Sequence, residues 1–131
     1  MLYDNTIFNL SETRDAIREF LSSISDCVYL NEEIEFKLKI IINELVTNSF
    51  KHASPRNYVR VLAKLNGTFI SIAVIDDGVG FDYAQYRDVD ISEENHIMKE
   101  GGRGIHIVDV LSDVLRYNRK GNIIAIKVNL V

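Results

Sequence analysis

Two strand-like runs joined by Asn66-Gly67 constrain the fold of this chain more than any other feature. The runs are YVRVLAKL at 58–65 and TFISIAVID at 68–76, and both are rich in residues that favour strands. Asn-Gly between two such runs is the strongest short-range signal for a β-hairpin, because both residues accept the positive φ angles of a tight turn. The sequence therefore predicts an antiparallel hairpin.

Helical patterns lie on both sides of this hairpin. Ser11 is expected to cap a helix over 12–24, and Asn31 is expected to cap a helix over 32–53 whose acidic start suits the helix dipole. A third helix is predicted from a glycine-rich turn, over 101–114. The other expected strands are an edge strand at 3–9 and a closing hairpin at 114–119 and 123–131. About three helices on one face of a mostly antiparallel mixed sheet give an α+β two-layer sandwich.

Composition indicates a single domain over 1–131. The chain has 131 residues, of which 47% are hydrophobic, enough for one core. Its formal net charge of -4 argues against a surface for nucleic acid or for an anionic membrane. No apolar run approaches the roughly 20 residues of a membrane span, and the lone Cys27 can form no internal disulfide. A cytoplasmic protein is the expectation.

The end of the 32–53 helix carries an unusual polar stripe. At 100° per residue, Glu44, Asn48 and Lys51 lie within about 60° of one another. A different sector holds the apolar residues Leu38, Ile41, Ile42, Leu45 and Val46. Taken alone, the stripe is better explained as a solvated face than as a functional one, because charged helix faces are ordinarily exposed to water.

A second motif, VIDDGVGFD, follows the second strand of the hairpin. Gly78 and Gly80 permit positive φ angles and let a ligand approach the backbone, and Asp76 at a strand end can accept a hydrogen bond from an amino group. An ordinary loop turn remains the alternative. The motif is not the dinucleotide-binding fingerprint, because Tyr83 stands where its third glycine would be.

A third motif, EGGRGIHIV at 100–108, opens the last predicted helix. Free N–H groups at a helix start bind anions, and Arg103 offers a fork of donors to a phosphate. A hinge for a lid is the other interpretation, since the polar stretch at 77–100 is long for a compact domain. No P-loop, nucleophile elbow or metalloprotease motif is present in the sequence.

The order of these motifs suggests the parts of one nucleotide site. Asp76 would read the amino group of adenine, and the glycines would let base and phosphates lie against the backbone. Asn48 would hold Mg²⁺ against the phosphates, and Lys51 would offset their charge. The polar stripe on the helix would then be the floor of this site.

With these motifs, the chain resembles the GHKL ATPase superfamily, and most of all its small anti-sigma factor serine kinases of the RsbW and SpoIIAB type. ELVTNSFKHA resembles the N box of the family, DDGVGFD its first glycine box and GGRGIHIV its second. The resemblance covers essentially the whole chain. It implies a single histidine-kinase-like ATP-binding domain with the GHKL type of sandwich.

The resemblance also implies roles for individual residues. Glu44 would be the general base, Asn48 the magnesium ligand, Asp76 the adenine reader and Arg14 a contact to protein partners. The nucleotide would also be bound by Lys51, His52, Gly78, Gly80, Gly101, Gly102, Arg103, Gly104 and Ile105. One departure is Gly121-Asn122-Ile123, where the family usually has Gly-Thr-Thr or Gly-Thr-x. The threonine contact near Asp76 is then missing or replaced.

Two functions follow from the resemblance. The first is an ATP- and Mg²⁺-dependent serine/threonine protein kinase that phosphorylates a small anti-anti-sigma protein and binds a sigma factor, as a homodimer. The second is a non-catalytic ATP-binding module whose nucleotide state controls partner binding. Glu44 favours the kinase, because binding alone does not require a base at that position.

Overall fold

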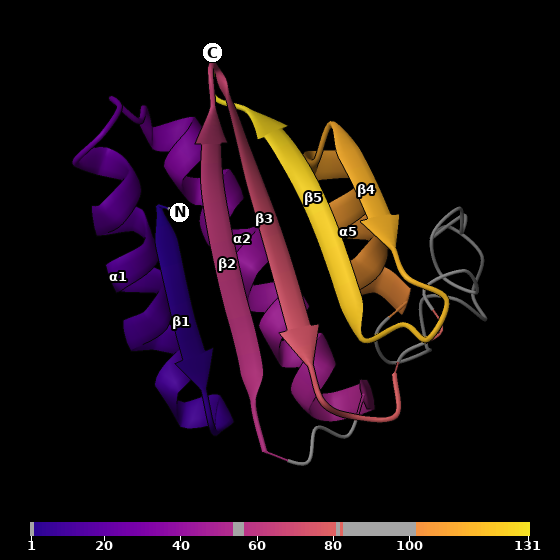
Figure 1. The fold of residues 1–131 in the computed structure, drawn as a ribbon. Helices are drawn as coiled ribbons and strands as arrows, with labels where there is room; N and C mark the ends of the chain where they lie inside the picture. Colours follow the sequence, from indigo (N-terminus) through magenta and orange to yellow (C-terminus); the bar gives the residue numbers. More distant parts are fainter. Residues whose placement is uncertain (1, 54–56, 81, 83–101) are drawn as a thin grey trace.

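The computed structural model describes residues 2–53, 57–80, 82 and 102–131 of the chain. They form a five-stranded sheet with helices over one face, so the expected α+β two-layer sandwich is confirmed (Figure 1). In chain order the elements are β1 (Tyr3–Ile7), the 3₁₀ turn η1 (Leu10–Glu12), α1 (Thr13–Ser25), α2 (Glu32–Asn48), the π-helical turn η2 (Ser49–Ala53), β2 (Val59–Asn66), β3 (Phe69–Asp76), α5 (Gly102–Leu111), β4 (Val114–Tyr117) and β5 (Ile123–Asn129).

The sheet has the strand order β1-β2-β3-β5-β4, and each of these neighbouring pairs is antiparallel. The predicted central hairpin is β2–β3. Its turn differs by one residue from the expectation, because Asn66 still pairs with Phe69 and the two-residue loop is Gly67-Thr68. Gly67 has a φ of 61°, so the glycine supplies the positive φ that the tight turn requires.

The core lies between the sheet and the helices. In β2, β3 and β5 the inward-facing residues alternate with half-buried or exposed ones and are mostly Val and Ile. Tyr3 on the edge strand β1 packs edge-to-face on Phe20 of α1, and the Tyr3 hydroxyl donates a hydrogen bond to the Ala16 carbonyl at 3.0 Å. The core side chains that are both large and fully buried include Phe20, Ile24, Leu38, Ile41, Ile42, Leu45, Ile70, Ile72 and Ile105.

The two expected helix caps have different outcomes. The Asn31 side chain accepts a hydrogen bond from the Ile34 N–H at 2.8 Å, so it caps α2 as predicted. Ser11 does not cap α1, because it lies inside η1 and its hydroxyl donates to the Asn9 side chain instead. Since η1 runs directly into the helix, Glu12 has helical dihedral angles and α1 starts without an extended cap residue.

The long helix predicted over 32–53 changes its winding near its end. The α-helical part stops at Asn48, and Ser49–Ala53 form the wider π-helical turn η2. Single π-helical turns occur frequently at functional sites. The last helix is also shorter than expected: α5 ends at Leu111, and β4 begins at Val114.

The Asn31 cap gives a test of the start of α2. Asn31→Ala removes the acceptor for the Ile34 N–H and is expected to lower the free energy of unfolding by about 1 kcal/mol in urea titrations. Asn43→Ala is the matched control, because Asn43 is exposed within the same helix and alanine has the higher helix propensity. Equal stability of the two variants would contradict a role for the cap.

Candidate functional site

The polar stripe of α2 and η2 is not a uniformly solvated face. Asn48 is only 5% exposed, Glu44 is half-buried and Lys51 is exposed. The Asn48 amide nitrogen is buried and has no hydrogen-bond partner in the described part of the chain. Since buried polar groups are nearly always paired, this amide fits a place where a polar ligand binds. The solvated-face interpretation is therefore wrong for Asn48 and holds only for Lys51.

Asp76 is a buried carboxylate at the end of β3, only 2% exposed. Burial raises its pKa above the usual value for aspartate, and the negative charge of Asp77 adds to that effect. The Gly78 N–H donates to the Asp76 carboxylate at 2.8 Å, and the Ser49 side chain also hydrogen bonds to it; both interactions lower the pKa. The bond from Ser49 joins the end of α2 to the end of β3.

The turn between β4 and β5 is tied to the backbone of Asp76. The Asp76 N–H donates to the Asn122 carbonyl at 3.0 Å, and the Asn122 side-chain amide donates to the Asp76 carbonyl at 3.2 Å. The Asn118 carboxamide oxygen accepts from the N–H groups of Gly121 and Asn122, and its amide donates to the Asn122 carboxamide at 2.6 Å. The sequence analysis noted Asn122 as a departure from the family but missed its structural role in this turn. The signal was the pair of asparagines around Gly121, since asparagine side chains commonly hydrogen-bond to the backbone of turns.

The loop after β3 lies directly against this turn. Gly80 has a φ of 96°, and a Cβ atom there would overlap the Lys120 carbonyl oxygen, so the position requires glycine. Asp77 accepts hydrogen bonds from the backbone N–H and the side-chain amide of Asn57, at 3.1 and 3.0 Å. Asp77 therefore anchors the segment that leads into β2, a role that the sequence analysis also missed.

The glycine-rich start of α5 meets the polar part of α2. A Cβ atom at Gly104 would overlap the Glu44 carboxylate, so glycine at this position lets Glu44 lie against the first turn of α5. Ile105 is fully buried, and its side chain belongs to the core. Through Glu44–Gly104 and Ser49–Asp76, α2 and η2 contact both glycine motifs, as the order of the motifs suggested.

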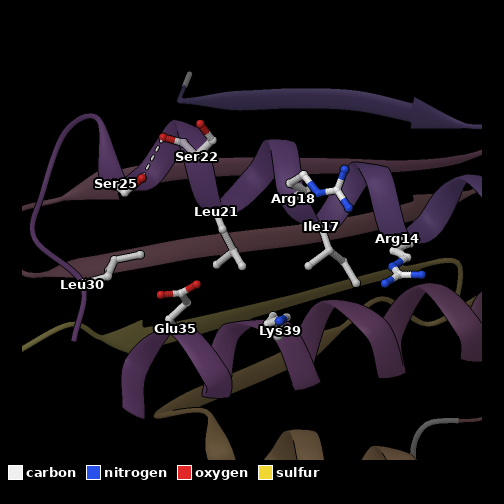
Figure 2. A pocket seen from close by; sticks show the side chains of 9 residues that line it. All are labelled: Arg14, Ile17, Arg18, Leu21, Ser22, Ser25, Leu30, Glu35 and Lys39. Carbon is white, nitrogen blue, oxygen red and sulfur yellow. Dashed lines mark hydrogen bonds between the residues drawn. The ribbon is translucent and has the colours of Figure 1, made fainter. Parts of the chain in front are cut away.

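The other predicted site residues fall into three groups. Gly101 and most of the expected lid at 77–100 lie outside the described residues. His52, Gly102 and Arg103 are described only through their backbone, in η2 and α5. Their roles in nucleotide binding stay predictions, as do those of the residues placed above. Arg14 is exposed on α1, where it lines a groove between α1 and α2 (Figure 2).

Comparison with known families identifies the domain. The histidine kinase-like ATPase domain family matches residues 9–128. The chain belongs to this family. The match includes Glu44, Asn48, Asp76 and both glycine motifs, so the family assignment and the geometry concern the same part of the molecule.

Individual relatives cover the chain to different extents. An anti-sigma F factor of Clostridium beijerinckii is 27% identical over 118 residues, which are 87% of this chain and 80% of that protein. The serine-protein kinase RsbW of Staphylococcus aureus (strain MW2) is 30% identical over 92 residues, 63% of this chain and 58% of that protein. An uncharacterized sensor-like histidine kinase of Chloroflexus aurantiacus is 41% identical over 59 residues, which are 45% of this chain and 10% of that protein.

A solved structure shows the same fold. The histidine kinase AdeS of Acinetobacter baumannii superimposes with a TM-score of 0.53 at 14% identity, covering 99% of this chain and 68% of the AdeS chain. Among the described residues, no helix has the length and apolar character needed to cross a membrane.

The raised pKa of Asp76 predicts how pH acts on stability. A carboxyl whose pKa is higher in the folded state stabilises the fold while protonated, below the pKa of unfolded aspartate near 3.9, and that contribution is lost as pH rises through the raised pKa. Asp76→Asn removes this titration and still accepts from the Gly78 N–H. We expect the stability of the variant relative to wild type to increase with pH over this window and then level off.

Urea unfolding of both proteins between pH 4 and pH 7.5 measures this difference. Other titrating groups are common to the two proteins, so the difference isolates Asp76. A stability difference that is the same at every pH would show that Asp76 titrates equally in the folded and unfolded chains.

Proposed function

We propose that this domain is an ATP-dependent serine/threonine protein kinase that phosphorylates a small anti-anti-sigma-like protein and binds a sigma factor. The observation that carries the proposal is the contact of the Glu44 carboxylate with the glycine start of α5. One helical turn further along α2 lies the buried Asn48 amide nitrogen, which has no hydrogen-bond partner among the described residues. The printed names of the anti-sigma F factor and the RsbW kinases among its relatives support the choice of partners.

Asp76 is the proposed reader of adenine. Its carboxylate is held at the end of β3 by Gly78 and Ser49, and its backbone is held by Asn122, so the group cannot rotate freely. A carboxylate oxygen accepts the exocyclic amino group of adenine, whereas guanine presents a carbonyl oxygen at the corresponding position. The fixed acceptor therefore favours ATP over GTP.

Asn48 is the proposed holder of Mg²⁺. A carboxamide oxygen is the hard type of ligand that Mg²⁺ accepts. The Asn48 amide nitrogen is a donor without a partner in the described residues, so it is left to pair with a bound polar ligand. When bound, the metal ion neutralises charge on the β- and γ-phosphates. Lys51 is exposed next to this position and would add a further positive charge.

Glu44 is the proposed general base. Phosphate oxygens are bound by free N–H groups at a helix start, and the Glu44 carboxylate lies at the first turn of α5. The hydroxyl oxygen of the acceptor serine or threonine forms a bond to the γ-phosphorus as the bond to the bridging oxygen breaks and ADP leaves. Glu44 accepts the hydroxyl proton. Phosphoryl transfer requires little more from a protein than such positioning.

One observation favours the non-catalytic binding module as the second candidate. Asn122 stands where the family usually has a threonine, and its side-chain amide and carbonyl are both bonded within the protein, to Asp76 and Asn118. Asn122 therefore holds the turn against β3, and it offers no hydroxyl group to the adenine of a bound nucleotide. In this alternative, the bound nucleotide only sets the shape that grips a partner.

Variants of Glu44 and Asn48 separate the two candidates. Asn48→Ala is expected to lose both ATP binding and phosphoryl transfer, because the metal ligand is gone. Glu44→Gln keeps the shape and should bind ATP within a few-fold of wild type, while transfer falls by about 10²–10⁴ because the base is missing. Calorimetry with ATP and a radiolabel assay with small anti-anti-sigma-like proteins measure the two quantities.

Two outcomes would decide against the kinase. If Glu44→Gln phosphorylated its substrate normally, Glu44 would not be the base. If wild type bound ATP and a partner but transferred phosphate to none of the candidate proteins, the binding module would be the better description. Asn43→Ala serves as the control, since Asn43 is exposed on the same helix.

Asp76 gives a separate test of the nucleotide. Asp76→Asn replaces an acceptor by a carboxamide and should weaken ATP binding by about 1.5–3 kcal/mol, the usual contribution of a hydrogen bond to a charged group. Wild type should bind GTP much more weakly than ATP. Calorimetry that gave equal affinities for ATP and GTP would show that Asp76 does not read the base.

A further inference from the structure

A groove of about 500 Å³ lies between α1 and α2 (Figure 2). Ile17 and Leu21 of α1 and Leu30, just before α2, point into it and form its apolar floor. Ile17 is buried, and Leu21 and Leu30 are half-buried. Leu21 and Leu30 therefore leave apolar surface open between the two helices.

Three cations surround one part of this floor: Arg14 and Arg18 from α1, and Lys39 from α2. Arg14 and Lys39 form no ion pair within the described residues, and Arg18 has only a contact of 3.7 Å to the exposed Asp15. Exposed pairs of that kind contribute little. These cations gather at the groove although the chain as a whole has a net charge of -4.

The charges are arranged with a direction. Figure 2 shows Arg14 and Arg18 toward one end of the groove, Lys39 near its middle, and Glu35 toward the other end, near Leu30. From Arg14 to Ser25 the groove follows α1 for roughly 16 Å, at 1.5 Å per residue. A long, open groove of this kind suits a segment of chain better than a compact small molecule.

We propose that this groove binds an acidic amphipathic segment of a partner protein. Apolar side chains of the segment cover Leu21 and Leu30, and its acidic residues lie beside Arg14, Arg18 and Lys39. The groove extends the partner contact proposed for Arg14 to both helices. The inference rests on the proposed function only in expecting a protein partner, and it requires neither ATP binding nor phosphoryl transfer.

The test selects ligands from a phage-displayed library of random 12-residue peptides, using the whole chain without nucleotide. Selected peptides are then measured by fluorescence anisotropy against wild type and two double variants. Arg18→Glu/Lys39→Glu reverses two charges at the groove. Lys64→Glu/Lys127→Glu makes the same change of net charge at exposed positions of β2 and β5, outside the groove lining.

We expect the selected peptides to combine acidic residues with large apolar ones. They should bind the groove variant roughly tenfold more weakly or worse, bind the sheet control like wild type, and lose affinity as salt is added. Leu21→Ala should also weaken binding, because the segment loses part of its apolar contact. Circular dichroism confirms that each variant is folded.

Other outcomes overturn the proposal. Peptides without acidic residues, or peptides that bind the groove variant and the sheet control equally well, would place the partner surface elsewhere. Binding of wild type to vesicles containing phosphatidylserine that is lost in the groove variant, without any acidic peptide being selected, would make the groove a membrane contact. ATP affinity, measured on the same variants, should not change, so a failure here is distinct from a failure of the nucleotide site.

Discussion

The packing of α2 against the inner face of the sheet is the interaction on which the rest of the structure depends. One side of this helix is completely buried, through Leu38, Ile41, Ile42, Leu45 and Val46. The helix therefore cannot rotate or shift along the sheet without exposing large aliphatic side chains to water. Glu44 and Asn48 lie in the neighbouring sector, so the core also sets their direction. The candidate site is therefore a consequence of how the hydrophobic core packs.

Asp76 shows that such a site lowers the stability of the folded protein. A carboxylate buried at a strand end is destabilising at neutral pH, and burial accordingly raises its pKa. The surrounding structure offsets part of that cost through the Gly78 N–H, the Ser49 side chain and the turn containing Asn122. A purely structural residue at this position would be expected to be apolar, like the rest of the strand. A buried carboxylate with a shifted pKa is typical of a functional site.

Helix α2 also connects the candidate nucleotide site with the proposed partner groove. Lys39 lines the groove, Glu44 contacts the first turn of α5, and Asn48 is the buried last residue of α2. The three residues lie within about two and a half turns of a helix whose other side is buried. A partner segment bound to α1 and α2 would thus lie on the same rigid element as the candidate base, which is a physical route by which a partner and a nucleotide could influence one another.

The sequence by itself determined the elements that depend on local patterns: the alternating strands, the Asn31 cap and the three polar motifs, whose residue types already predicted a nucleotide site. Tertiary structure decided what depends on neighbours distant in the chain. It buried Asn48 while leaving Lys51 exposed, placed Gly104 against Glu44 and tied Asn122 to Asp76. Periodicity gives the side of a helix a residue occupies, but burial and hydrogen bonding depend on what packs against that side, and only the assembled layers supply it.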